Sequence, residues 1–133
     1  MRAARAYQSV GQHTAVIAGE PVDLVILLYE KLLQRLREVR VSIEKGDIGG
    51  RGEACGKGIE LIEKGLIGCL DMRQGGSIAA QLKVQYDRWM AMILRCNVSA
   101  DIVLLESIEF EVKEILSAWQ ELRAQRRSMR EAS

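Results

Sequence analysis

The sequence contains very few of the side chains that bind metals or act as nucleophiles. It has one histidine, His13, and three cysteines, Cys55, Cys69 and Cys96. The cysteines are odd in number and form no CxxC pair, which disfavours a disulfide framework or a zinc site and favours small apolar core residues. A single histidine excludes the paired Glu-x-x-His motifs of di-iron bundles and leaves no convincing Ser/His or Cys/His pair for nucleophilic catalysis. We therefore expect no enzymatic activity, no metal and no cofactor.

A glycine-rich stretch, GGRGEACGKG at residues 49–58, lacks the spacing of a phosphate-binding loop. Five residues separate Gly50 from Gly56 where the P-loop has four, and Lys57 is followed by Gly58 instead of a hydroxyl residue that could hold magnesium. The dinucleotide-binding pattern also fails, because Cys55 stands where its third glycine belongs and no β-rich run precedes it. We expect no nucleotide site here.

Long apolar runs and a strong charge of one sign are also missing. No run of about 18 uncharged apolar residues occurs, so we expect no membrane insertion. The formal net charge is only +1, which argues against a dedicated nucleic-acid binder. The first ten residues, MRAARAYQSV, have no apolar signal-peptide core, and we expect a cytoplasmic protein.

With one proline and few aromatic residues, the chain is typical of helices separated by polar breaks. Pro21 suits the first turn of a helix, and glycines break the chain near residues 46–50 and 75–76. Ser77 and Ser99 are candidate helix caps, and Asp101 suits the positively charged first turn of the last helix. Apolar residues recur every three or four positions in four segments. These are Val25, Leu28, Leu32, Leu36, Val39 and Ile43; Cys55, Ile59, Ile62, Leu66 and Cys69; Ile78, Leu82, Tyr86, Trp89 and Ile93; and Leu105, Ile108, Val112, Ile115, Trp119 and Leu122.

Short breaks between helices of roughly 20 residues predict an all-α, antiparallel up-down four-helix bundle over residues 19–125. Residues 1–18 have apolar side chains too sparse for a strong core face, so we expect a short N-terminal cap or arm that includes Tyr7 and Val10. Residues 126–133 are predicted to form a disordered basic tail. A docking role for the four arginines of RAQRRSMREAS remains an alternative.

A second apolar face appears on three of the predicted helices, away from the core stripes. One explanation is that single exposed apolar residues are ordinary, or that they flank a wide core stripe. The other is a set of grooves that accept the apolar side of a guest helix. For the second helix, the small residues could also reflect close packing inside the bundle. The candidate partner-binding residues are Ala54, Leu61, Gly65, Met72, Ala80, Val84, Ala91, Val103 and Phe110.

The order and spacing of several short motifs resemble the FliS family of flagellar secretion chaperones. These motifs are AYQSV, PVDLVILLYE, EKGDIGGRGEACGKGIELIEKGLIGCLD, GGSIAAQL, YDRWM, CN and SAWQEL. Three of them are the most specific: the run Pro21, Leu24, Leu28 and Tyr29; the hairpin Leu70, Asp71, Gly75 and Gly76; and the pair Tyr86 and Asp87. The similarity covers nearly the whole chain, from about residue 6 to residue 122.

This resemblance implies a cytoplasmic helical bundle that binds the C-terminal segment of flagellin and prevents premature polymerisation. It also implies delivery of flagellin to the cytoplasmic domain of the flagellar type III export gate. The N-terminal segment would cover part of the guest surface. A homo-oligomeric adaptor or structural bundle, including a homodimer, is the alternative from another class.

Overall fold

The computed structural model describes residues 21–132, and these residues form helices with no strand among them. The four long helices are α2 (Pro21–Lys45), α3 (Ile48–Glu60), α4 (Gly76–Ser99) and α5 (Ile102–Ala132). The all-α prediction is therefore confirmed. Predictions for Tyr7, Val10, His13 and the arm at residues 1–18 lie outside the described residues.

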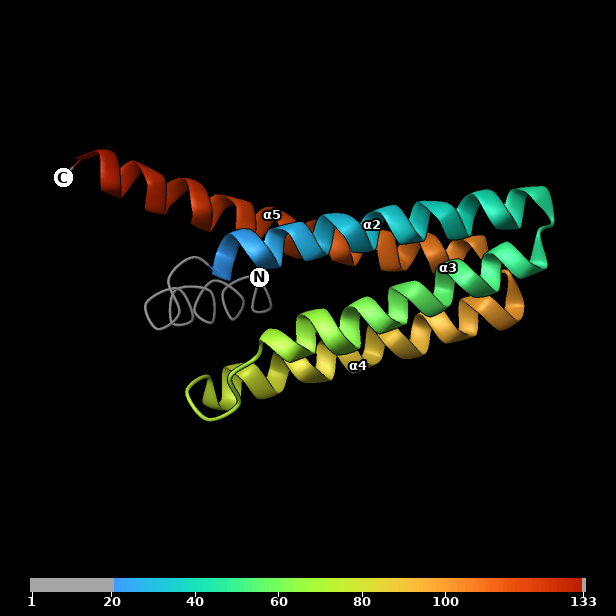
Figure 1. The fold of residues 1–133 in the computed structure, drawn as a ribbon, viewed down its shortest axis with the longest axis horizontal. Coiled ribbons are helices and arrows are strands. Elements are labelled where there is room, and N and C mark those ends of the chain that lie inside the picture. Colours follow the sequence, from blue (N-terminus) through green and yellow to red (C-terminus); the bar gives the residue numbers. More distant parts are fainter. Residues whose placement is uncertain (1–20, 133) are drawn as a thin grey trace.

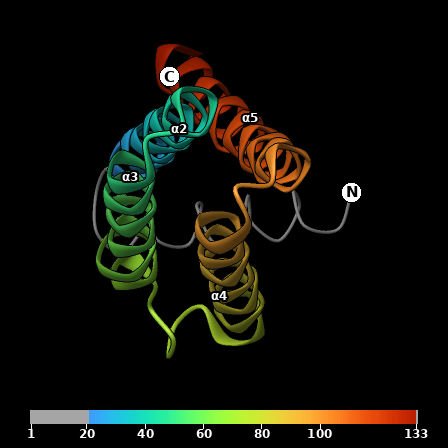
Figure 2. The same cartoon turned by 90° about the vertical axis from the view of Figure 1, so that its right-hand side faces the viewer.

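Consecutive helices run in opposite directions, as Figure 1 shows by the colour order along the chain. Helix α2 packs against α3 and α5, and α4 packs against the same two helices, so each helix has two neighbours around the bundle axis (Figure 2). This is the arrangement that short connections between helices favour.

The predicted stripes form the core of the bundle. Their members are buried or packed against the buried cluster wherever the structure describes their side chains, apart from Cys69, which is half-buried and outside that cluster. Near the middle, the Tyr29 and Tyr86 hydroxyls lie 3.0 Å apart within hydrogen-bond distance, and the Trp89 ring meets both tyrosine rings. These contacts connect α2 to α4 across the core. Repetition at every third or fourth residue is sufficient to place such side chains on one side of each helix.

The helix ends differ in part from the predicted caps. Asp47 caps α3, because its side chain accepts a hydrogen bond from the backbone N–H of Gly50. Asp101 does the same for the Leu104 N–H at the start of α5. Ser99, proposed as a cap of this helix, is instead the last residue of α4. Ser77 is also not a cap, since α4 already begins at Gly76. Carboxylates accept N–H bonds at helix starts as well as hydroxyls do.

The predicted second helix is not one regular α-helix. After Glu60 the chain widens into a π-helix over Leu61–Leu66 and then tightens into a 3₁₀ turn over Ile67–Cys69. Apolar spacing of three and four residues does not distinguish these forms, because their periods differ by less than one residue per turn from that of the α-helix.

The structure of residues 126–132 differs from the disordered tail expected at 126–133, whose last residue lies outside the described part of the chain. Helix α5 continues without interruption to Ala132. The segment 123–132 is rich in arginine, alanine, glutamine, glutamate and methionine, which have good helix propensities and can extend a helix beyond its last core contact at Leu122.

Candidate partner-binding surface

The outer side of α4 exposes the second apolar stripe that the sequence analysis identified. Val84 is 68% exposed, and Ala80 and Ala91 are also exposed. They lie on the opposite side of the helix from Leu82, which is 1% exposed. Val98 extends this stripe by two further turns at 79% exposure, and sequence reasoning missed it although its seven-residue spacing from Ala91 was visible.

The outer side of α5 carries the matching pair. Val103 is 74% exposed and Phe110 is 68% exposed, as the sequence predicted for a face opposite the core. Both side chains line a shallow hollow of about 480 Å³ together with Glu106, Ser107 and Glu111. A large aromatic side chain beside an open hollow is the kind of surface that a guest side chain can fill.

A charged clamp joins the two helices next to these stripes. The two guanidinium nitrogens Nη1 and Nη2 of Arg88 donate to the Glu111 carboxylate, which also accepts from Trp89 Nε1 at 3.2 Å and from Gln85 Nε2 at 3.3 Å. The hydrogen bond from Arg88 is the main cause that lowers the pKa of Glu111, against an opposing effect of burial. The carboxylate therefore stays charged at neutral pH.

The clamp divides the apolar surface into two rows. Arg88 lies four residues after Val84 and three before Ala91, so it shares their side of α4 while reaching to α5. We call Ala80, Val84, Ala91 and Val98 the α4 row, and Val103 and Phe110 the α5 row. A guest in contact with both rows would meet a neutralised ion pair between them.

Three partner-binding candidates from the second predicted helix, Ala54, Leu61 and Gly65, are not on an open outer face like those of α4 and α5. Ala54 is only 6% exposed and belongs to the core, so its assignment to a guest surface is wrong. Gly65 faces α2, where an added Cβ would lie 3.1 Å from Leu28 Cδ2, and Leu61 is half-buried against the core. Close packing inside the bundle, the alternative left open by the sequence, accounts for Ala54 and for the side of Gly65 that faces α2. The physical reason is that α3 has α2 as a second neighbour.

Two of these residues still reach the surface, and Met72 is separate from them. Leu61 and Gly65 form the floor of a hollow of about 420 Å³ between α2 and the segment 57–65, with a rim of Lys31, Arg35, Lys57, Glu60 and Lys64. Met72 is exposed in the turn before α4. The structure thus brings Leu61 and Gly65 together, apart from both rows.

The described residues offer no alternative site with metal or thiol chemistry. Within 21–132 there is no group of three or more His, Cys, Asp or Glu side chains that could hold a metal ion. All three cysteines are free, and burial raises the pKa of the Cys55 thiol to about 11, which keeps it protonated and unreactive. Over the same residues no helix is long and apolar enough to cross a membrane.

Comparison with known proteins identifies the family of this chain. The family described as "Flagellar protein FliS" matches residues 3–126. The chain is 32% identical over 118 residues to the flagellar secretion chaperone FliS of Salmonella typhimurium, which covers 89% of this chain and 87% of that protein. It is 33% identical over 119 residues to the flagellar secretion chaperone FliSB of Pseudomonas aeruginosa, which covers 90% of this chain and 94% of the relative. The flagellar secretion chaperone FliS of Vibrio cholerae is 30% identical over 118 residues, which cover 89% of this chain and 86% of that protein. The chain therefore belongs to the FliS family of flagellar proteins.

Proposed function

We propose that this protein is a cytoplasmic export chaperone that binds the C-terminal segment of flagellin. Bound in this way, flagellin would be kept from polymerising early and would be delivered to the cytoplasmic domain of the flagellar export gate. The relatives named above are flagellar secretion chaperones. The observation that carries the proposal is the exposure of Val84, Val103 and Phe110 on two adjacent helices whose core is complete without them.

The spacing of the rows fits a helical guest. Val84, Ala91 and Val98 recur every seven residues, which corresponds to about 10.5 Å along a helix, and so do Val103 and Phe110. An amphipathic guest helix presents apolar side chains at the same interval. Burying one Val or Phe side chain completely contributes roughly 1.5–3 kcal/mol, so a few such contacts can offset the cost of ordering a flexible segment.

Leu61 and Gly65 provide a second, smaller contact for the same extended guest. Their hollow has an apolar floor and a rim with more basic than acidic residues. A short piece of the guest that carries an apolar side chain beside a carboxylate would complement it. Binding of this kind requires no chemical step, in keeping with membership of a chaperone family.

Calorimetric titration with flagellin tests the proposal directly. Full-length flagellin should bind at a fixed ratio, whereas flagellin that lacks its C-terminal segment should give no binding heat. Light scattering of the free protein distinguishes the alternative, in which the rows hold copies of this chain together as a homo-oligomeric adaptor. A stable oligomer that does not bind flagellin would contradict the chaperone proposal and favour the adaptor.

A further inference from the structure

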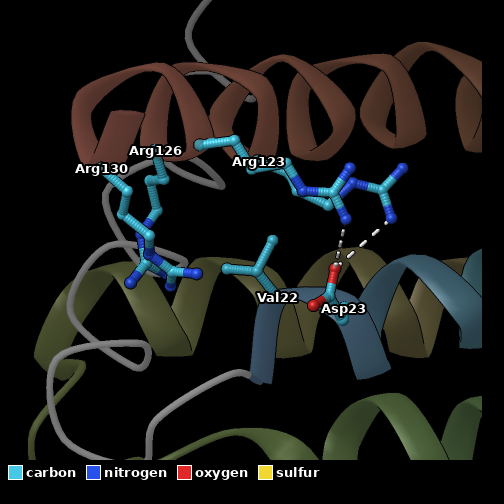
Figure 3. A pocket seen from close by; sticks show the side chains of 6 residues that line it. Val22, Asp23, Arg123, Arg126 and Arg130 are labelled. Carbon is cyan, nitrogen blue, oxygen red and sulfur yellow. Dashed lines mark hydrogen bonds and ion pairs between the residues drawn. The ribbon is translucent and has the colours of Figure 1, made fainter. Parts of the chain in front are cut away.

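Four arginines near the end of α5 gather over the first turn of α2. Arg123, Arg126, Arg127 and Arg130 line a hollow of about 290 Å³ together with Val22 and Asp23. Figure 3 shows the side chains of Arg126 and Arg130 reaching down beside Val22, while Arg123 points to Asp23. We call this the arginine pocket. Asp23 is the one acidic residue among those that line it.

The negative charge of Asp23 is already shared between two of the arginines. Its Oδ1 atom lies 3.4 Å from Arg123 Nη1 and 4.0 Å from Arg127 Nη2. Arg126 also lines the pocket and has no ion pair with Asp23. Arg123, Arg126 and Arg127 thus share one carboxylate among the residues that line the pocket, which keeps an excess of positive charge.

One guanidinium nitrogen in the pocket also lacks an acceptor. The Nη1 atom of Arg126 is shielded from solvent, and it has no hydrogen-bond partner among the described residues. A buried donor without an acceptor costs free energy, and more so when it is charged. The start of α2 adds to the positive potential, because the first N–H groups of a helix have no partner within it and carry partial positive charge. The site is therefore suited to an anion.

We propose that the arginine pocket binds a short acidic segment of a partner protein through its carboxylates. The guanidinium group presents a planar fork of donors that matches a carboxylate, and several forks around one hollow suit two or more neighbouring acidic side chains. The pocket lies at the junction of α5 and the start of α2, and no residue that lines it belongs to the α4 or α5 row. This inference therefore does not depend on the proposed binding of flagellin.

The charges around the pocket favour an acidic peptide over a nucleic acid. A phosphate backbone needs a basic surface that extends well beyond one pocket. Before Arg123, however, the only basic residue of α5 is Lys113, and acidic side chains dominate that part of the helix. These acidic residues are Glu106, Glu109, Glu111, Glu114 and Glu121. A strand of nucleic acid that continued along α5 would be repelled, whereas a short peptide could end within the basic region.

The protein's own N-terminal sequence is a poor match for the pocket. Residues 1–20 contain Arg2 and Arg5 and a single acidic residue, Glu20, so they are basic overall. In addition, Arg127 and Arg130 lie beyond residue 126, where the match to the family ends. The complete pocket is thus a feature of this chain that the family match does not cover.

Fluorescence anisotropy of a fluorescein-labelled hexaglutamate peptide, titrated with the full-length protein, tests this inference. The double variant Arg126→Gln/Arg130→Gln should bind the peptide about tenfold more weakly or worse. The control Arg37→Gln/Arg95→Gln removes the same charge from exposed positions on α2 and α4 and should stay within about twofold of the native protein. Asp23→Asn removes the competing carboxylate and should strengthen binding.

Three results would overturn the inference. The first is a native protein that does not bind the peptide. The second is an equal loss of affinity in both double variants, which would mean that only net charge matters. The third is a labelled DNA hexanucleotide that binds as tightly as the peptide and loses affinity in the same variant. Circular dichroism of both double variants should show unchanged helix content, so that a loss of binding is not a loss of fold.

Discussion

Leu82 and Val84 lie two residues apart on α4 and should respond in opposite ways to the same substitution. Leu82 is 1% exposed in the core, whereas Val84 is 68% exposed in the α4 row. In the free protein, Val84→Glu leaves the new carboxylate in water, so the free energy of unfolding should change by no more than about 0.5 kcal/mol. Leu82→Glu places the same group in the buried core cluster, which also contains Tyr86 and Trp89.

The cost of Leu82→Glu has two parts. Losing the burial of a leucine side chain costs roughly 1.5–3 kcal/mol. The introduced glutamate avoids burying its charge by taking up a proton. The ordinary pKa of glutamate is about 4.3, so pH 7 lies about 2.7 units above it. Protonating the carboxylate at pH 7 therefore costs roughly 3.7 kcal/mol, at about 1.36 kcal/mol per unit. Together these reach the lower end of the total stability of a domain, about 5–15 kcal/mol, so the variant should be largely unfolded at pH 7.

The pH dependence provides a further check on this reasoning. The folded-state pKa of the introduced glutamate is raised above its unfolded value, so its penalty is absent below about pH 4.3 and grows as the pH rises from there. Leu82→Glu should therefore regain stability towards pH 4 relative to the native protein at each pH. Urea unfolding followed by circular dichroism at pH 7 and pH 4 measures both effects. Equal destabilisation by Val84→Glu and Leu82→Glu would refute the assignment of the α4 row to the surface.

Affinity measurements show whether the exposed apolar rows contact flagellin. Val84→Glu, and Phe110→Glu on the α5 row, should each weaken the affinity for a flagellin C-terminal peptide, because a guest helix would bury the new carboxylate without a partner. Each 1.4 kcal/mol lost corresponds to a tenfold weaker affinity. Calorimetry with both folded variants measures this change. Unchanged affinity in both would mean that the guest binds elsewhere on the bundle.

Three further predictions concern stability. In urea unfolding, Arg40→Met should destabilise the protein by on the order of 3 kcal/mol, and Glu109→Met by about 1 kcal/mol. Arg40→Met leaves the charge of Glu109 without its partner on a side chain that is only 11% exposed. Glu109→Met leaves the charge of Arg40, whose side chain is 33% exposed and can reach water. The hydrogen bond from Arg88 lowers the pKa of Glu111, so this group contributes stability above its ordinary pKa that is lost as pH falls through the lowered value. Between pH 7 and pH 3, the melting temperature should therefore decrease less for Glu111→Gln than for the native protein. An equal decrease in both proteins would contradict the role of that hydrogen bond. Gly56→Ala should raise the free energy of unfolding by about 0.5–1 kcal/mol, since an added Cβ at this position in α3 meets nothing within 4 Å, and a loss of stability would refute this.

The sequence by itself determined the helices and most of the core. The stripes that contain Leu36, Trp89 and Val112 are buried as their spacing predicts, because helical periodicity is a local property that each segment carries alone. The exposure of Val84 and Phe110 could be predicted for the same reason, since both lie opposite a strong stripe. The irregular π and 3₁₀ turns after Glu60 could not be predicted, because their apolar spacing resembles that of an α-helix.

Only the tertiary structure decided what the remaining faces meet. Ala54 and Gly65 have the spacing of a guest-binding row, yet Ala54 is buried in the core and Gly65 lies against Leu28 of α2. A helix in a bundle has two neighbours, and a periodic pattern shows the direction of only one. In the same way, the four arginines of the C-terminal segment suggested a frayed tail when considered alone. They become a pocket because the antiparallel packing of α5 on α2 brings Arg123 to Asp23, a residue that precedes it by 100 positions in the chain. Contacts at such separation depend on how whole helices pack, and no local pattern specifies them.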